Sequence, residues 1–426
     1  MRKLCYTRPL SRLVVSAGLA AIAALGGAQA PRFSVTNLGQ LASGAESDFA
    51  YAMSSDGTKV VGSAQYLVNR QSVYHAFYWN GTMHDIGALG GPTAYGVSRN
   101  GTVVLGAYPG AVWSLTSGKV ALMAPDGSSA NAYAINDSDI VVGRGRTTTW
   151  IGNDSGGNPV YAFVALQWSR DPITGNWGSI SLQPLPGFNF SGAFGGIDAN
   201  GNIVGTSSYY DPSTGVTIAN EATLWSPNDG FVPHDMGPIG SVGAGSWVDP
   251  VTLDSRYVWN LGSGACYTDS TGTIQLPFPD PSNPANQAHG VNASGMVAGF
   301  ATYGGNPHAY CWSGGVQTDL GVLTGMTSSL TWTDTFRARP IDDNGFIIGW
   351  CNGSNGSQKA FVSTPTSRGT SAKMLDLNTL LSNTLKGVSL SSLNMALATN
   401  NAGFILCNGT ASGSGGQRVA LLRRVQ

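Results

Sequence analysis

The stretch Ala50-Tyr-Ala-Met-Ser-Ser-Asp-Gly-Thr-Lys-Val-Val-Gly62 decides the fold, because it recurs along the chain. Two short apolar segments, which we expect to be strands, flank a polar centre that contains Asp and Gly. Glycine in such a centre supplies the positive φ that a tight hairpin turn needs. Eight copies occur, the fifth of them degenerate, and they begin at Ala50, Ala94, Ala132, Gly195, Val251, Ala288, Arg339 and Ala398.

Each hairpin is followed by a second pair of predicted strands. The third strand carries Ala-x-x-Trp, which begins at Ala76, Ala165, Ala222 and Ala309. The fourth carries Asp-apolar-Gly or a variant, which begins at Asp85, Asp235, Asp319 and Asp376. Four short strands in a unit of roughly 40 to 60 residues match the size of a β-propeller blade. The repeat therefore predicts an all-β chain built from blades.

The two ends of the repeat region favour a closed ring. Phe33-Ser-Val-Thr-Asn-Leu-Gly39 matches a fourth strand, yet no first, second or third strand precedes it. The last copy ends in a third strand, Arg418-Val-Ala-Leu-Leu422, with no fourth after it. The first segment can therefore complete the last blade, whereas an open array would leave two unpaired edges. We predict one β-propeller domain over residues 31–426 with eight four-stranded blades, or seven if the Val251 copy is not a blade.

The repeat also resembles the bacterial extracellular repeat family named for its His-Ala-Phe triplet (HAF repeat proteins). Tyr74-His-Ala-Phe-Tyr-Trp79 followed by Asn80-Gly-Thr-Met-His-Asp-Ile-Gly-Ala-Leu-Gly-Gly91 is similar to that family's full motif. Further similar segments are His308-Ala-Tyr-Cys-Trp312 with Thr318-Asp-Leu-Gly-Val-Leu323, Lys359-Ala-Phe361 and Asp376-Leu-Asn-Thr-Leu-Leu381. Residues 208–280 depart most from the pattern. The resemblance covers residues 33–425 and implies secretion and a propeller-like fold, but no activity.

Residues 1–30 are typical of an export signal. Four basic residues between Arg2 and Arg12 precede a short apolar run from Leu13 to Leu25, and small residues follow up to Ala30. The run is short for a membrane span, and an uncleaved N-terminal anchor is the alternative. Cleavage after Ala28 and after Ala30 both stay open. We expect an exported protein, extracellular or at the cell surface, with the periplasm as the alternative.

Charge is sparse along the chain. Only 11% of residues are charged and the formal net charge is -1, so we expect no basic surface for nucleic acid or for anionic lipid. We predict no nucleic-acid partner, no membrane span in the mature chain and a monomer. The cysteines beyond the signal permit either two disulfides or buried free thiols; they are Cys266, Cys311, Cys351 and Cys407. Without a Cys-x-x-Cys pair or a histidine cluster, a zinc site is not expected.

Residues that recur once per blade are best explained by folding, which all blades share. His75 and His308 occupy one repeat position, and His84 and His234 another. His84-Asp85 and the equivalent pair at His234 cannot be dyads, because neighbours on a strand point to opposite faces. The loops that begin at Asp198 and Asp342 contain Asp, Asn and Gly but lack the downstream carboxylate of a calcium loop. No nucleophile elbow or phosphate loop occurs, and we predict no catalytic residue, cofactor or metal.

Function is expected where the blades differ. The distinctive insertions are residues 151–160, 170–178, 209–218, 277–286 and 363–371. They hold Trp177, Tyr209 and Tyr210, whose rings suit stacking on sugars, although surface decoration without a ligand is the alternative. We predict a non-enzymatic binding scaffold for a glycan or a protein.

Two other functions stay open. One is a secreted or periplasmic enzyme, a hydrolase or lyase acting on polysaccharide, with its site at the mouth of the ring. Three or more titratable residues that converge at the mouth from different blades would favour it. The other is a purely structural surface protein.

Overall fold

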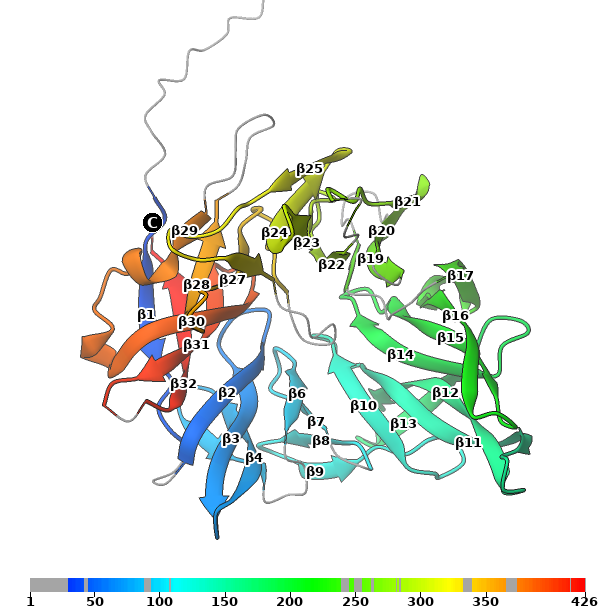
Figure 1. Cartoon of the computed structure of the whole chain (residues 1–426). Coiled ribbons are helices and arrows are strands. Elements are labelled where there is room, and N and C mark those ends of the chain that lie inside the picture. Colours follow the sequence, from blue (N-terminus) through cyan, green and yellow to red (C-terminus); the bar gives the residue numbers. More distant parts are fainter. Residues whose placement is uncertain are drawn as a thin grey trace, which may run out of the picture.

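The repeats form a ring of eight antiparallel sheets with four strands each (Figure 1). The computed structural model describes residues 30–41, 45–87, 93–106, 109–238, 245–248, 255–261, 264–280, 282, 285–331, 339–364, 374–413 and 415–425. The predicted all-β propeller with eight blades is confirmed. The alternative of seven is excluded, because the segment with the degenerate copy also forms a four-stranded sheet.

Each sheet is one blade, and blades 1 to 7 use four consecutive strands. Blade 1 has β2 (Ala45–Met53), β3 (Val60–Val68), β4 (Gln71–Trp79) and β5 (Met83–Asp85), and blade 2 has β6 (Ala94–Val97), β7 (Val103–Leu105), β8 (Ala111–Ser114) and β9 (Gly118–Ala121). Blade 3 has β10 (Ala130–Ile135), β11 (Val141–Asn153), β12 (Pro159–Arg170) and β13 (Trp177–Leu182), and blade 4 has β14 (Phe190–Ile197), β15 (Ile203–Asp211), β16 (Val216–Trp225) and β17 (Pro233–Pro238).

The second half of the ring follows the same plan. Blade 5 has β18 (Gly245–Val248), β19 (Ser255–Leu261), β20 (Gly264–Asp269) and β21 (Gly272–Gln275), and blade 6 has β22 (Asn286–Val291), β23 (Val297–Tyr303), β24 (Asn306–Ser313) and β25 (Val316–Asp319). Blade 7 has β26 (Ser328–Leu330), β27 (Ile347–Asn352), β28 (Gln358–Ser363) and β29 (Met374–Asp376), and blade 8 has β30 (Leu390–Thr399), β31 (Phe404–Ala411), β32 (Gln417–Arg424) and β1 (Phe33–Asn37). The described residues also include three short 3₁₀ turns between strands: η2 (Pro227–Asp229), η3 (Leu377–Thr379) and η4 (Lys386–Val388).

The order of strands gives the ring two different faces. Neighbouring strands within a blade are antiparallel, so the turns after the first and third strands lie at one face and the turn after the second strand lies at the other. We call these the first-turn face and the second-turn face. In blade 1, for example, the turn between β2 and β3 lies on the first-turn face, and Asn69 and Arg70 form the tip on the second-turn face.

The ring closes as predicted, through β1. This strand pairs with β32, with Phe33 opposite Arg424 and Asn37 opposite Ala420. The outer edge of β1 is also covered: the Phe33 amide donates to Leu380 O (3.0 Å), and Asn383 binds both the amide (2.8 Å) and the carbonyl (2.9 Å) of Val35. The described part of blade 8 therefore does not offer β1 as an open edge, which would invite aggregation.

Two residues of the repeat explain packing between blades and within a blade. Trp168 and Trp225, of the Ala-x-x-Trp motif, are almost fully buried, and each indole N–H donates to the preceding blade, at Met123 O (2.7 Å) and Gln183 O (2.8 Å). The glycine that ends the second-strand motif is required by space, because a Cβ on Gly143 would lie 1.9 Å from Asn131 O of the first strand. The motif therefore encodes contacts within and between blades.

Some sequence predictions lie outside the described residues. These include most of the export signal predicted over residues 1–30, and residues 251–254 of the repeat copy that begins at Val251. The described residues include no helix with the length and apolar character that a membrane crossing demands. All four cysteines beyond the signal are buried free thiols, one in each of blades 5 to 8, so the disulfide alternative is not realised.

Candidate functional site

The histidine and aspartate of the repeat pair within their own blade. His75 Nδ1 on β4 lies 2.9 Å from Asp85 Oδ2 on β5, and Asp85 Oδ1 accepts a hydrogen bond from the Gly87 amide (2.9 Å). The carboxylate thus holds the end of the fourth strand with one oxygen and the third strand with the other. Such a bridge stabilises the fold, because it joins the third and fourth strands. It occupies both side chains.

The same bridge recurs in two other blades, with a histidine in one and a lysine in the other. In blade 6, His308 Nδ1 lies 3.0 Å from Asp319 Oδ2. In blade 7, Lys359 takes the place of the histidine, 3.7 Å from Asp376. His84, the neighbour of Asp85, instead contacts Asn80 Oδ1 (3.1 Å).

The first residue of each described first turn is polar and buried, and its side chain caps the turn. These residues are Ser54, Ser98, Asn136, Asp198, Asn292, Asp342 and Asn400. Asn292 Oδ1 accepts the amides of Ser294 (3.1 Å) and Met296 (3.0 Å), while Nδ2 donates to Asp342 O of the next blade (3.0 Å). Asp198 likewise accepts backbone amides of its own turn. Within the described residues, no three His, Cys, Asp or Glu side chains are grouped so that they could hold a metal ion.

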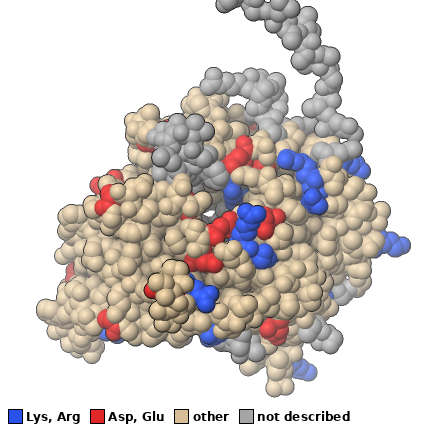
Figure 2. All heavy atoms as spheres, turned by 180° about the vertical axis from the view of Figure 1, so that it is seen from behind, with Lys and Arg blue, Asp and Glu red and all other residues tan. Residues whose placement is uncertain are grey.

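Charged side chains of both signs gather around a central hollow on one face of the molecule (Figure 2). The first turns of blades 1 to 3 supply such a set. Asp137 of blade 3 accepts hydrogen bonds from the Arg99 amide of blade 2 (2.9 Å) and from Ser55 Oγ of blade 1. Asp56 of blade 1 lies 3.7 Å from Arg99 Nε. Titratable groups from three blades therefore converge on the first-turn face.

These carboxylates are committed to hydrogen bonds. Burial alone would raise the pKa of Asp56, but the hydrogen bonds from Ser54 and Thr58 hold it below its usual value. Asp139 accepts hydrogen bonds from Ser98 Oγ (2.5 Å) and Asn100 Nδ2 (3.0 Å). A general acid for glycoside hydrolysis needs the opposite, a carboxyl whose pKa is raised. Asp137 and Asp139 therefore connect the first turns of blades 1 to 3 through hydrogen bonds.

The second-turn face has a different character at blades 3 and 4. Strands β11 and β12 extend into a long hairpin, and the second hairpin of blade 4 packs beside it, since a Cβ on Gly152 would lie 2.5 Å from Pro212 Cγ. Trp150 is 60% exposed, Tyr209 43% and Ile218 63%. Two of the predicted insertions, residues 151–160 and 209–218, are thus brought together. We call this surface the blade 3–4 rim.

Rings and polar groups support the blade 3–4 rim from below. Tyr210 stacks on Phe190, with ring centroids 5.0 Å apart and an angle of 7° between the planes. Asn189 fixes the backbone of Tyr210 by binding its amide (2.8 Å) and its carbonyl (2.7 Å). The Trp150 indole donates to Asn153 Oδ1 (3.2 Å). Tyr210 is therefore a supporting residue, and Tyr209 and Trp150 are the accessible rings.

The structure does not bring Trp177 to the same place. Trp177 begins β13, after the third turn of blade 3, so it lies on the first-turn face and packs against the core between blades 2 and 3. Trp150 was not among the predicted site residues, although the spacing between Gly143 and Ala165, longer than that between Gly62 and Ala76, could have shown that this hairpin is longer than its neighbours. The insertions at 277–286 and 363–371 lie partly outside the described residues.

No family pattern and no curated protein sequence matches the chain. Among solved structures, the Dos1 propeller is similar over 92% of this chain and 94% of that one, with a TM-score of 0.51 and 11% identity. The β-propeller domain of the Trilobed protease from Pyrococcus furiosus matches over 78% of this chain and 96% of that one, with a TM-score of 0.44 and 8% identity. At such low identity the likeness to the Dos1 propeller concerns the fold alone: this chain is a β-propeller.

Proposed function

We propose that the protein is an exported, non-enzymatic binding scaffold that takes a glycan or a protein ligand on the blade 3–4 rim. The observation that supports this most is the exposure of Trp150, Tyr209 and Ile218 on two hairpins that pack against each other. Large apolar side chains gathered on a surface commonly mark a binding region. Trp and Tyr also combine a large rigid contact area with a polar group, which suits both sugars and protein surfaces.

We also infer export and kinship with the His-Ala-Phe repeat proteins. Residues 1–30 have the composition of an export signal, and residues 74–91 carry the family motif. The bridges from His75 to Asp85 and from His308 to Asp319 give that motif a physical purpose, because they join the third and fourth strands. Kinship of this kind leaves the ligand open.

The second candidate function is an enzyme at the mouth of the ring. The convergence of Asp56, Arg99 and Asp137 from three blades favours it. The pKa of Asp56, held below its usual value, does not suit general-acid catalysis. We therefore rank binding above catalysis.

The test is a glycan array, with hydrolysis of the same polysaccharides followed in parallel. We expect saturable binding without turnover. Trp150→Ala and Tyr209→Ala should each weaken binding by about tenfold or more, because a central aromatic contact is often worth about 2 kcal/mol. Trp177→Ala is the matched control, since it removes an aromatic ring on the opposite face.

Each outcome separates the candidates. Loss of binding in Trp177→Ala but not in Trp150→Ala would move the site to the first-turn face. Turnover that disappears in Asp137→Asn would overturn the scaffold proposal in favour of the enzyme. If the array gives no binding, the same variants should be compared in capture of exported proteins, where an equal yield for Trp150→Ala and the unmodified protein would reject the blade 3–4 rim.

A further inference from the structure

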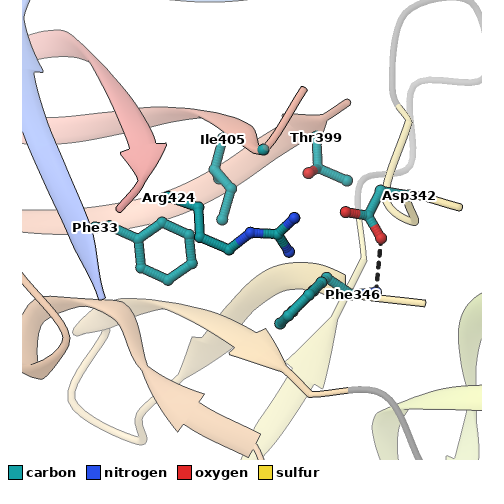
Figure 3. A pocket seen from close by; sticks show the side chains of 7 residues that line it. Phe33, Asp342, Phe346, Thr399, Ile405 and Arg424 are labelled. Atoms are coloured by element: carbon teal, nitrogen blue, oxygen red, sulfur yellow. Dashed lines mark hydrogen bonds between the residues drawn. The ribbon is translucent and has the colours of Figure 1, made fainter. Parts of the chain in front are cut away.

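The strand that closes the ring, β32, has an arginine near each end. Arg418, near its start, is 8% exposed and lies 3.7 Å from Asp48 of blade 1. Arg424, at its end, points toward Asp342 in the first turn of blade 7 (Figure 3). Both aspartates are buried. The closing strand thus directs one cation toward each of the two neighbouring blades.

A small cavity lies beside Arg424 and Asp342. It is lined by both residues together with Phe346, Thr399 and Gly403, among others, and it has room for about one water molecule. The guanidinium carbon of Arg424 lies 4.7 Å from the centroid of the Phe346 ring. A Cβ on Gly403 would lie 3.5 Å from Arg424 Nε. The ring and the glycine therefore confine the guanidinium next to the cavity.

The polar groups at this cavity still have hydrogen bonds to make. Among the described residues, no acceptor is bound by the Arg424 guanidinium, and it does not come within the 4.0 Å of an ion pair with Asp342. Asp342 accepts the Phe346 amide (2.8 Å) and, more weakly, Asn344 Nδ2 (3.5 Å), which leaves acceptor sites unused. The guanidinium is half-buried, and a small polar pocket between a charged donor and a carboxylate acceptor is where ordered water is found.

We propose that this cavity is a hydration site, whose single water accepts a hydrogen bond from Arg424 and donates one to Asp342. Strand β32 then faces blade 1 through the ion pair of Arg418 and Asp48 and is joined to blade 7 by a water-mediated pair. The amide of Thr399, which donates to Arg339 O across the same seam (2.9 Å), would share this support. The water-mediated contact thereby stabilises the seam between blades 7 and 8, independently of any ligand on the blade 3–4 rim.

The direct test is a high-resolution crystal structure of the unmodified protein. We expect one ordered water within hydrogen-bonding distance of an Arg424 nitrogen and an Asp342 oxygen. An empty cavity would overturn the proposal, and so would a guanidinium that contacts the carboxylate directly.

A second test measures the strength of the seam by amide hydrogen exchange. Arg424→Met removes the charged donor, and Arg423→Met is the matched control, because Arg423 is the exposed neighbour on the same strand. We expect exchange of the Thr399 amide to be about tenfold faster in Arg424→Met than in Arg423→Met, as loss of a charged hydrogen bond predicts. Equal exchange in the two variants, with amides of blade 4 as an internal reference, would show that the water does not hold the seam.

Discussion

At the scale of single residues, Asp48 stands out because blades 4 and 7 place a serine at its position. Ser191 of blade 4 occupies that position, and its hydroxyl joins the preceding blade by accepting the Ala165 amide (2.8 Å) and donating to Leu182 O (2.9 Å). In blade 1 the neutral hydroxyl is replaced by a buried carboxylate opposite Arg418. The ring therefore closes at a charged pair, whereas the seams before blades 4 and 7 use neutral hydrogen bonds of a serine.

The replacement of a serine by Asp48 predicts that the stability of the protein depends on pH. Burial raises the pKa of Asp48 from 3.8 to about 6, against the opposing effect of Arg418. Because the folded state holds the proton more tightly than the unfolded state, this contribution is complete below pH 3.8 and is lost as the pH rises through about 6. The two pKa values differ by an amount that corresponds to roughly 3 kcal/mol at neutral pH.

Asp48→Asn should therefore remove that pH dependence. We expect the variant to gain stability over the unmodified protein between about pH 4 and pH 7, measured by chemical unfolding at each pH. His289 acts in the opposite direction, because burial lowers its pKa to about 3, so only the difference between the two proteins is diagnostic. A constant difference across this range would contradict the role given to Asp48.

At the scale of the strands, blade 4 breaks the bridge between the third and fourth strands. Glu221 stands where His75 and His308 stand in their blades, and it faces Asp235. Burial and then the charge of Asp235 raise the pKa of Glu221. Two carboxylates at this position repel each other, whereas blades 1, 6 and 7 have a favourable contact there.

Glu221→Lys should restore the bridge, in the manner of Lys359 in blade 7. We expect a gain of about 1 kcal/mol in the free energy of unfolding, the upper end for a partly exposed pair. Glu221→Gln is the control, because it removes only the repulsion and should give about half that gain. If both variants have the same stability in a thermal scan at neutral pH, no bridge has formed.

The strands were also the level at which the sequence was most informative. Short apolar segments, Asx-x-Gly turns and the final glycine predicted the hairpins because each of these features has a local physical cause. The blade 3–4 rim was only half predicted. Tyr209 and Tyr210 are neighbours on one strand and point to opposite faces; which of them is exposed was decided by Phe190, a ring from a different strand on which Tyr210 stacks. Contacts of that kind depend on the way the strands are packed together, which no local pattern contains.

At the scale of the whole molecule, stability depends on the closure of the ring by β1. Phe33 and Val35 are buried in the core between blades 7 and 8, whereas Thr36 on the same strand is exposed. The ends of the repeat predicted this closure, because an orphan fourth strand and an incomplete blade can satisfy each other. The convergence of Asp56, Arg99 and Asp137 could not be predicted, since it arises only when three blades curve around one axis.

Val35→Ala should therefore destabilise the whole molecule, although it removes only two methyl groups. We expect a loss of about 2 kcal/mol in the free energy of unfolding from the cavity left behind. Thr36→Ala, the matched control on the exposed side, should cost about 0.5 kcal/mol or less. Unfolding by denaturant measures both, and equal losses would show that β1 contributes little to the core.

The pairing of β1 with β32 has a mechanical consequence. Phe33 lies opposite Arg424, so the chain enters and leaves blade 8 at the same end of one antiparallel pair. Tension applied between these two points would peel the strands apart one hydrogen bond at a time, while the other blades bear no load. A molecule attached at only one end of the chain would keep its ring intact, because no tension would act between β1 and β32. A molecule stretched between two tethers would open first at this joint.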